Sequence, residues 1–248
     1  MTSNRFFIRK DQLHFPRAVL TGEEHHHLKA VVRIRPEEKV WLFDEEGMSY
    51  LARVEELSKD KTQLYILKKV ARKRFLSRIT LAQALIKPNK MDLIVQKVTE
   101  LGVMSFIPVV TSRTLVKMEH HKDKKHTRWK RIALEAAKQC GRNILPEIQS
   151  PLTLDNFLKK AEETKRLYLK HNADRYFRNV LIQFSNKESS CPPDSVVVLI
   201  GPEGGWTDDE EIDILRHDFE AVNLGSNTLR SETAAIAATA MINHFWNQ

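Results

Sequence analysis

Three of the chain's 8 glycines lie in one stretch, GPEGG (201–205), where they flank a glutamate. Glycine adopts positive φ angles and lets another group approach the backbone N–H and C=O closely. The stretch therefore indicates either a tight turn between a strand and a helix that begins near Asp208 and Asp209, or a loop whose backbone contacts a ligand. It lacks the Gly-Lys-Ser/Thr sequence of a P-loop and does not fit the GxGxxG dinucleotide-binding pattern.

A second stretch, LGSNTLRSETA (224–234), favours the interpretation as a ligand site. Ser231 is predicted to be the N-cap of a helix whose small residues let it pack close to another backbone. Arg230 would precede that helix at the mouth of a pocket, where a guanidinium suits a phosphate or the edge of a nucleobase. The two stretches together predict a pocket lined by backbone and a few polar groups.

Both stretches follow predicted strands in a series in which strands and helices alternate. Predicted strands cover residues 79–86, 103–110, 166–169, 195–201 and 220–225, and predicted helices cover 91–102, 128–142 and 229–242. This alternation predicts a parallel sheet covered by helices on both faces. Ligands bind such sheets outside the carboxyl ends of the strands. Two more polar stretches, ALIKPNK (84–90) and PVVTSRT (108–114), are expected at that same edge.

The first 72 residues have a different pattern, which is typical of a small β-barrel. Two alternating runs within 40–57 surround Glu46-Gly47 and predict a hairpin, and 62–70 is a further strand. One short helical pattern covers Glu23–Ala30. The break between the two predicted domains, 1–72 and 73–248, falls at the basic stretch ARKRFLSR (71–78).

Composition limits the class of protein. The formal charge of +8 favours a polyanionic partner, although net charge can also serve solubility alone. No apolar run approaches the roughly 18 residues of a membrane span, and the charged start MTSNRFFIRKDQ predicts no export signal. Cys140 and Cys191 form neither a disulfide framework nor a metal-binding spacing, and the adjacent histidines HHH (25–27) cannot all reach one ion. A cytoplasmic protein without a metal is expected.

Taken together, the motifs resemble a known family. GPEGG and LG…LRSETA, with ELGV (100–103), SR (112–113) and QCGR…P (139–146), are similar to the RsmE-type 16S ribosomal RNA uridine-N3-methyltransferases of the SPOUT superfamily. RFF (5–7) and HHL…R (26–33) resemble that family's PUA-like RNA-binding domain. The chain departs from the family at Ser226-Asn227-Thr228, where relatives usually have a bulkier run, and at Glu37 and Lys138. The first departure concerns the adenosine pocket.

The resemblance implies a fold, a reaction and a set of partners. The fold is α/β, with a C-terminal trefoil-knot (SPOUT) domain and a small N-terminal β-barrel PUA-like domain. The reaction is methylation of N3 of a specific uridine in 16S ribosomal RNA of the small ribosomal subunit, with S-adenosyl-L-methionine as the methyl donor. The protein would be a homodimer through the knot domain, with its cofactor sites near the subunit interface.

The resemblance also implies site residues. Arg230 would stabilise the uridine anion electrostatically, and Glu232 is a candidate general base. Glu203 would fix its loop or face the sulfonium of the cofactor. The expected cofactor contacts are Leu199, Ile200, Gly201, Pro202, Glu203, Gly204, Gly205, Leu224, Gly225, Asn227, Leu229 and Thr233. The expected RNA contacts are Arg5, Arg9, His26, His27, Arg33, Arg35, Arg113 and Arg142.

Three alternatives stay open at this point. A SPOUT ribose 2′-O-methyltransferase would share the fold, but SETA stands where those enzymes usually have an Asn-rich serine motif. A non-catalytic ribosomal-RNA-binding protein would use the basic β module and would not bind S-adenosylmethionine. A nucleotide-binding enzyme that uses GPEGG for phosphate is disfavoured, because acidic residues follow the glycines.

Overall fold

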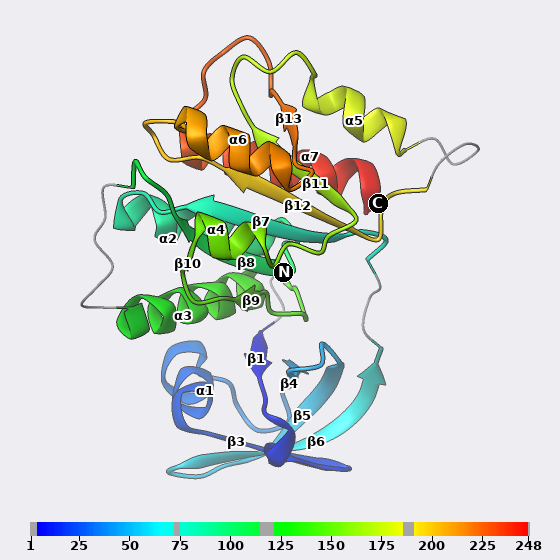
Figure 1. The fold of residues 1–248 in the computed structure, drawn as a ribbon. Coiled ribbons are helices and arrows are strands. Elements are labelled where there is room, and N and C mark those ends of the chain that lie inside the picture. Colours follow the sequence, from blue (N-terminus) through cyan, green and yellow to red (C-terminus); the bar gives the residue numbers. More distant parts are fainter. Residues whose placement is uncertain (1–3, 72–74, 115–121, 186–190, 248) are drawn as a thin grey trace. The chain divides into compact units, whose positions relative to one another are not determined.

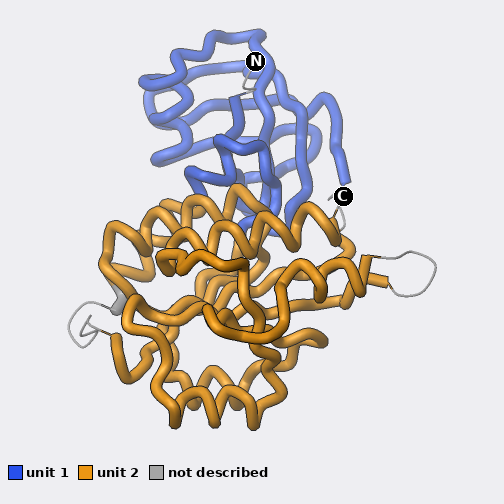
Figure 2. Tube along the Cα trace, turned by 90° about the horizontal axis from the view of Figure 1, so that it is seen from above, with its two compact units in different colours: residues 1–74, 134–145 blue, residues 75–133, 146–248 orange. Residues whose placement is uncertain are grey.

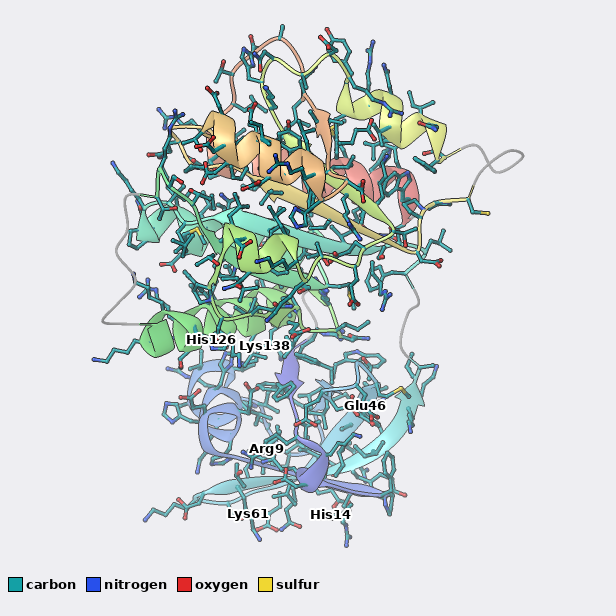
Figure 3. All side chains as sticks on the ribbon, viewed as in Figure 1. Arg9, His14, Glu46, Lys61, His126 and Lys138 are labelled. Atoms are coloured by element: carbon teal, nitrogen blue, oxygen red, sulfur yellow. The ribbon has the colours of Figure 1, made fainter. Side chains whose placement is uncertain are left out.

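The computed structural model describes residues 4–71, 75–114, 122–185 and 191–247 (Figure 1). Figure 2 shows that the chain divides into two compact units, residues 1–74 with 134–145 (unit 1) and residues 75–133 with 146–248 (unit 2). The predicted second domain contained 134–145, whereas the structure groups this segment with unit 1. Two contacts distant in sequence join this segment to the rest of unit 1: Lys138 pairs with Glu24, and Asn143 accepts a hydrogen bond from Arg5 (Figure 3 labels Lys138).

Unit 1 is built on one six-stranded sheet of order β1-β4-β5-β6-β3-β2. Its strands are β1 (Arg5–Phe7), β2 (Leu13–His14), β3 (Arg17–Thr21), β4 (Lys39–Phe43), β5 (Ser49–Leu57) and β6 (Lys61–Val70). Neighbours run antiparallel except β1 and β4, which are parallel. The alternating residues of these strands bury one face around Leu20, Leu42 and Leu64. The sequence prediction found β4, β5 and β6 and missed the three short strands that precede them.

The hairpin between β4 and β5 is confirmed, and its turn depends on Asp44. The buried Asp44 carboxylate accepts the backbone N–H groups of Glu46 and Met48 and the hydroxyl of Tyr50. Gly47 has a φ of 78°, a conformation that glycine adopts without strain. The hydrogen bond to Asp44, together with burial as the larger cause, raises the pKa of Tyr50.

One helical segment packs on this sheet. It begins as α1 (Gly22–His26) and continues as a π-helix, η2 (His27–Val32), which places Leu28 in the core. A short 3-10 turn, η1 (Lys10–Gln12), lies between β1 and β2. The helix predicted at Glu23–Ala30 is therefore present, although half of it has π rather than α geometry.

Unit 2 contains a parallel sheet, as the alternating pattern predicts. Its path is β10-β8-β7-β12-β11-β13, with β9 also paired to β8. The strands are β7 (Arg78–Ala84), β8 (Ser105–Val110), β9 (Glu147–Ile148), β10 (Leu152–Thr153), β11 (Lys165–Leu169), β12 (Ser195–Ile200) and β13 (Glu220–Val222). Every residue of β12 is buried, which is expected for a strand in the middle of a sheet covered on both faces.

Helices cover both faces of this sheet (Figure 1). They are α2 (Pro88–Glu100), α3 (Lys122–Cys140), α4 (Leu154–Leu158), α5 (Phe177–Gln183), α6 (Asp208–Arg216) and α7 (Ser231–Trp246). Val196, Val198 and Ile200 of β12 share a core with α2, α3, α5 and α7, while Val197 and Leu199 share a second core with α4 and α6. No helix within the described residues is long and apolar enough to cross a membrane.

The start of α7 differs from the prediction. Arg230, not Ser231, is the N-cap residue, with extended backbone angles and no capping hydrogen bond from its side chain. Ser231 is instead the first helical residue, and its hydroxyl donates to the carbonyl of Gly201 at 2.7 Å. The first turn of α7 therefore contacts the glycine-rich loop, because the carbonyl of Gly201 accepts the hydrogen bond from the Ser231 hydroxyl.

Candidate active site

A cavity of about 850 Å³ lies at the carboxyl ends of the strands of unit 2. Its lining comes from the loops after β7, β11, β12 and β13: Lys87, Lys90, Leu169, Lys170, His171, Asn172, Ile200, Gly201, Pro202, Glu203, Gly205, Trp206, Glu211, Val222, Asn223, Leu224, Gly225, Asn227, Thr228, Leu229, Arg230, Ser231 and Ala234. Three of the four stretches expected at this edge contribute. The fourth, 108–114, does not line the cavity.

The glycines of the β12 loop allow close packing around this cavity. A Cβ on Gly201 would lie 3.0 Å from the indole of Trp206, and Gly205 has a φ of +70°. The Trp206 indole N–H donates to the carbonyl of Leu169 at 3.3 Å, which joins the β12 loop to the end of β11. A glycine is thus required at 201 because a side chain there would clash with the buried indole of Trp206. A glycine is favoured at 205 because its φ is positive.

The β13 loop leaves backbone groups available to a ligand. Gly225 has a φ of +130°, and a Cβ built there would have open space around it. Its N–H donates to the side chain of Asn223, which fixes the start of the loop. Among the described residues, the backbone N–H groups of Leu224, Asn227 and Leu229 have no hydrogen-bond acceptor.

Ser231 is hydrogen-bonded to groups at the ends of two strands, β7 and β12. The fully buried Gln83, at the end of β7, donates from its amide to the Ser231 hydroxyl at 2.9 Å. That hydroxyl donates in turn to Gly201. The chain after β13 therefore returns to lie beside both β7 and β12.

Lys90 was not foreseen, although it is the most connected charge in the site. Its ammonium pairs with Glu203 of the β12 loop and lies 3.1 Å from Oε1 of Glu232 in the first turn of α7. These hydrogen bonds, first to Glu203 and then to Glu232, raise the pKa of Lys90, and the bond from Lys90 lowers that of Glu203. A sequence signal existed: a lysine in the first turn of a helix opposes the helix dipole and calls for nearby carboxylates.

The remaining charges of the site fall into two groups. Lys170 pairs with Glu211 at 2.5 Å, and that hydrogen bond raises the pKa of Lys170. Lys87, His171 and Arg230 are exposed and form no ion pair with any residue that the structure describes.

Most predicted cofactor residues meet in this cavity. Ile200, Gly201, Pro202, Glu203, Gly205, Leu224, Gly225, Asn227 and Leu229 line it, as does the predicted catalytic Arg230. Leu199 does not, because alternation along β12 turns it into the core shared with α4 and α6. Gly204 and Thr233 are exposed outside the lining, and Glu232 is buried beside Lys90. Missed residues include Trp206, Asn223 and the β11 loop, Lys170–Asn172.

Two predicted RNA contacts take other places. Arg113 donates to the carbonyl of Gly204 at 2.6 Å and packs along that glycine, so it supports the β12 loop. Arg142, which was also expected near the catalytic pocket, is a residue of unit 1, and burial lowers its pKa to about 10. Arg5 is half-buried, and burial lowers its pKa as well.

The exposed predicted RNA contacts of unit 1 are Arg9, His26, Arg33 and Arg35 (Figure 3 labels Arg9). His27 is half-buried and meets the ring of Phe6 edge-on, and the buried His25 bonds to the Thr62 hydroxyl at 2.7 Å. The three adjacent histidines therefore point to different surroundings. Within the described ranges, no group of His, Cys, Asp or Glu could hold a metal ion.

Comparison with known proteins defines the class. A family model described as an RNA methyltransferase domain matches residues 73–243, and one described as an RNA methyltransferase PUA domain matches residues 20–67. The two matches are the parts of an RNA methyltransferase with a PUA-like N-terminal domain, and the first match covers residues 75–133 and 146–243 of unit 2 together with the segment 134–145 of unit 1.

Comparison with individual relatives identifies the family within this class. The chain is 31% identical to ribosomal RNA small subunit methyltransferase E of Bacillus subtilis (strain 168), over 97% of this chain and 96% of that protein. It is 33% identical to the protein of the same name from Synechocystis, over 96% and 77%. We conclude that the chain belongs to the ribosomal RNA small subunit methyltransferase E family.

Solved structures agree with this assignment. A putative methyltransferase from Legionella pneumophila, in complex with the bound cofactor SAM, has a TM-score of 0.88 at 30% identity, with 100% of each chain covered. The ribosomal RNA small subunit methyltransferase E from Neisseria gonorrhoeae, bound to S-adenosyl methionine, has a TM-score of 0.85 at 30% identity, with 98% of each chain covered.

Proposed function

We propose that this protein transfers a methyl group from S-adenosylmethionine to N3 of a specific uridine in 16S ribosomal RNA of the small ribosomal subunit. One observation carries the proposal: two glycine-bearing loops from the parallel sheet line one cavity, with the exposed Arg230 among the lining residues. The names of the relatives supply the RNA, and the bound cofactor of the solved neighbours supplies the methyl donor.

The residues present fit this cofactor. The cavity, of about 850 Å³, has the size of a small-molecule site. Leu169, Ile200 and Val222 give it apolar walls suited to an adenine ring. The available N–H groups of the β13 loop would bind acceptors on that ring or on the ribose. Backbone recognition of this kind tolerates the unusual Ser226-Asn227-Thr228 run, since side chains are not required.

Catalysis would depend on position and charge. The cofactor, when bound, supplies an activated methyl group, and an in-line transfer is accelerated chiefly by alignment of the reacting atoms. Uridine N3 becomes a good nucleophile only after it loses its proton. Arg230 would stabilise the resulting anion, since its guanidinium has no competing ion pair among the described residues. Glu232 remains our candidate base, because its Oε2 accepts no hydrogen bond from the described chain.

RNA would contact unit 1 as well as the cavity. Arg9, His26, Arg33 and Arg35 are exposed there, within or close to the part that matches the PUA domain model. Arg113 donates to Gly204 but is exposed and stays a proposed RNA contact, whereas the burial of Arg142 disfavours that residue as one. We further propose that the protein is a homodimer through unit 2 and that it works in the cytoplasm, where small ribosomal subunits are found.

We also propose that unit 2 is a trefoil knot and that unit 1 closes as a barrel. Support for the knot is the return of the chain after β13, where Ser231 is bonded to groups of β7 and of the β12 loop. Pulling the unfolded chain by its ends would test it. A knotted chain stops short of the full contour length for its number of residues, and an unknotted chain reaches it.

Calorimetric titration with S-adenosylmethionine, combined with methylation of small ribosomal subunits, tests the reaction itself. We expect binding, a product methylated at uridine N3, and an Arg230→Ala variant that binds the cofactor but loses most of its turnover. A product methylated on the ribose would establish a 2′-O-methyltransferase instead. Absence of cofactor binding would leave a non-catalytic RNA-binding protein.

A further inference from the structure

Lys90 connects three elements that each contribute to the cavity. It belongs to the first turn of α2, and its ammonium reaches Glu203 in the β12 loop and Glu232 in α7. Its side chain is 21% exposed, against 11% for Glu232 and 36% for Glu203. The pair with Glu232 is therefore the more enclosed of the two.

Glu232 depends on this lysine. It is 9% exposed as a residue, its Oε1 faces Lys90, and its Oε2 is buried without a hydrogen bond from the described chain. A buried carboxylate is strongly disfavoured once it loses the cation paired with it, so without Lys90 the structure around Glu232 must move. The first turn of α7 is the part that would move, because Glu232 lies in it.

That turn also carries the group expected to act on the substrate. Arg230 is the N-cap of α7, two residues before Glu232. Among the described residues, three side-chain contacts attach this helix start: Gln83 to Ser231, Ser231 to Gly201, and Lys90 to Glu232. The preceding segment has few internal bonds, since the N–H groups of Asn227 and Leu229 have no acceptor among the described residues.

We propose that Lys90 is a positioning residue for methyl transfer, which locks the first turn of α7 to the cofactor loop and so sets the place of Arg230 and Glu232. This inference rests on the proposed function but assigns a role to a residue that is not among the predicted site residues. It predicts that Lys90 affects turnover more than cofactor binding, because backbone groups hold the cofactor.

Kinetics with matched variants test the role. Lys90→Met should lower kcat by about a hundredfold, which is the loss expected when a catalytic group is misplaced by about 1 Å. The Kd for S-adenosylmethionine should change by less than about threefold, well below the tenfold change that corresponds to about 1.4 kcal/mol. Lys90→Arg keeps the charge and should restore most of the turnover. Lys159→Met, which breaks an exposed pair with Asp155, is the control and should change neither quantity. Equal losses in kcat and cofactor affinity, or no rescue by arginine, would overturn the proposal.

A stability cycle tests the same contact without any activity. The Tm of Lys90→Met should fall, and adding Glu232→Gln should bring it back toward wild type, because the buried charge is then removed together with its partner. Glu203→Gln should not do this, since Glu203 is more exposed. Additive losses in the Lys90–Glu232 cycle would refute the coupling even if the enzyme methylates uridine as proposed. If instead the chain lacks methyltransferase activity, the cycle still decides whether this pair locks α7.

Discussion

A single methyl group added at Gly201 should weaken cofactor binding, although this residue offers no side chain to the cofactor. The new Cβ of Gly201→Ala would lie 3.0 Å from Cε2 and 3.2 Å from Nε1 of Trp206. The indole cannot move away easily, because it is buried and bonded to Leu169. The loop must shift instead, and the site must be restored when the cofactor binds. Overpacking of this kind costs about 1–3 kcal/mol, which corresponds to a Kd raised about 5- to 150-fold.

Gly204→Ala is the matched control in the same loop. Its Cβ would lie 3.4 Å from Cδ of Arg113, an exposed and flexible side chain that can move aside. Neither glycine requires a positive φ, so the two variants differ in the neighbour that the methyl group meets. Calorimetry should show a Kd for S-adenosylmethionine within about twofold of wild type for Gly204→Ala, a difference well below 1.4 kcal/mol. Equal effects of the two substitutions, or no effect of either, would refute the argument that the indole sets the loop.

Three further predictions concern RNA, pH and stability. Lys87→Ala should lower the slope of log K for RNA against log salt by about 0.7, the value for one phosphate contact on a single strand, without changing cofactor affinity; Lys159→Ala should leave the slope unchanged. Burial raises the pKa of Glu24 above its ordinary value of 4.5, so the folded state binds this proton more tightly than the unfolded state does. The stability of the folded state should therefore fall as the pH rises and Glu24 loses its proton. Between about pH 4 and pH 7, the Tm of wild type should drop relative to that of Glu24→Gln. Glu210→Ala should lower the free energy of unfolding by about 2 kcal/mol, measured by urea denaturation, because the buried carboxylate accepts two backbone N–H groups.

Much of unit 2 could be predicted from periodicity. The strand SVVVLI has no polar residue after its first serine, which indicates burial on both faces, and the structure has it in the centre of the sheet. The short elements could not be found in this way. The strands β9 and β10 have two residues each, too few to show a period, and they form because β8 offers them an unpaired edge.

The glycine-bearing loops of the site could be predicted from residue type, whereas the contacts between side chains distant in sequence could not. Glycines mark loops by their own conformational freedom, so 201–205 and 224–234 could be placed at the cavity. Lys90 and Glu232 are far apart in the sequence, and a lysine in the first turn of a helix calls for a carboxylate without indicating which one. Ser231 was placed as an N-cap because its residue type suits that position. A tertiary contact with Gly201 proved stronger than that local preference.

The formal charge of +8 does not by itself locate the RNA, because two of the four lysines and arginines that line the cavity are already paired with glutamates. Lys90 and Lys170 are neutralised by glutamates that belong to the cavity's own loops and helices. Lys87 and Arg230 have no such partner among the described residues, and both act electrostatically on Glu203. Only an uncompensated cation gains from a phosphate, since a paired one must first give up its carboxylate. The RNA strand should therefore pass over Lys87 and Arg230, with the paired lysines holding the site in shape beneath it.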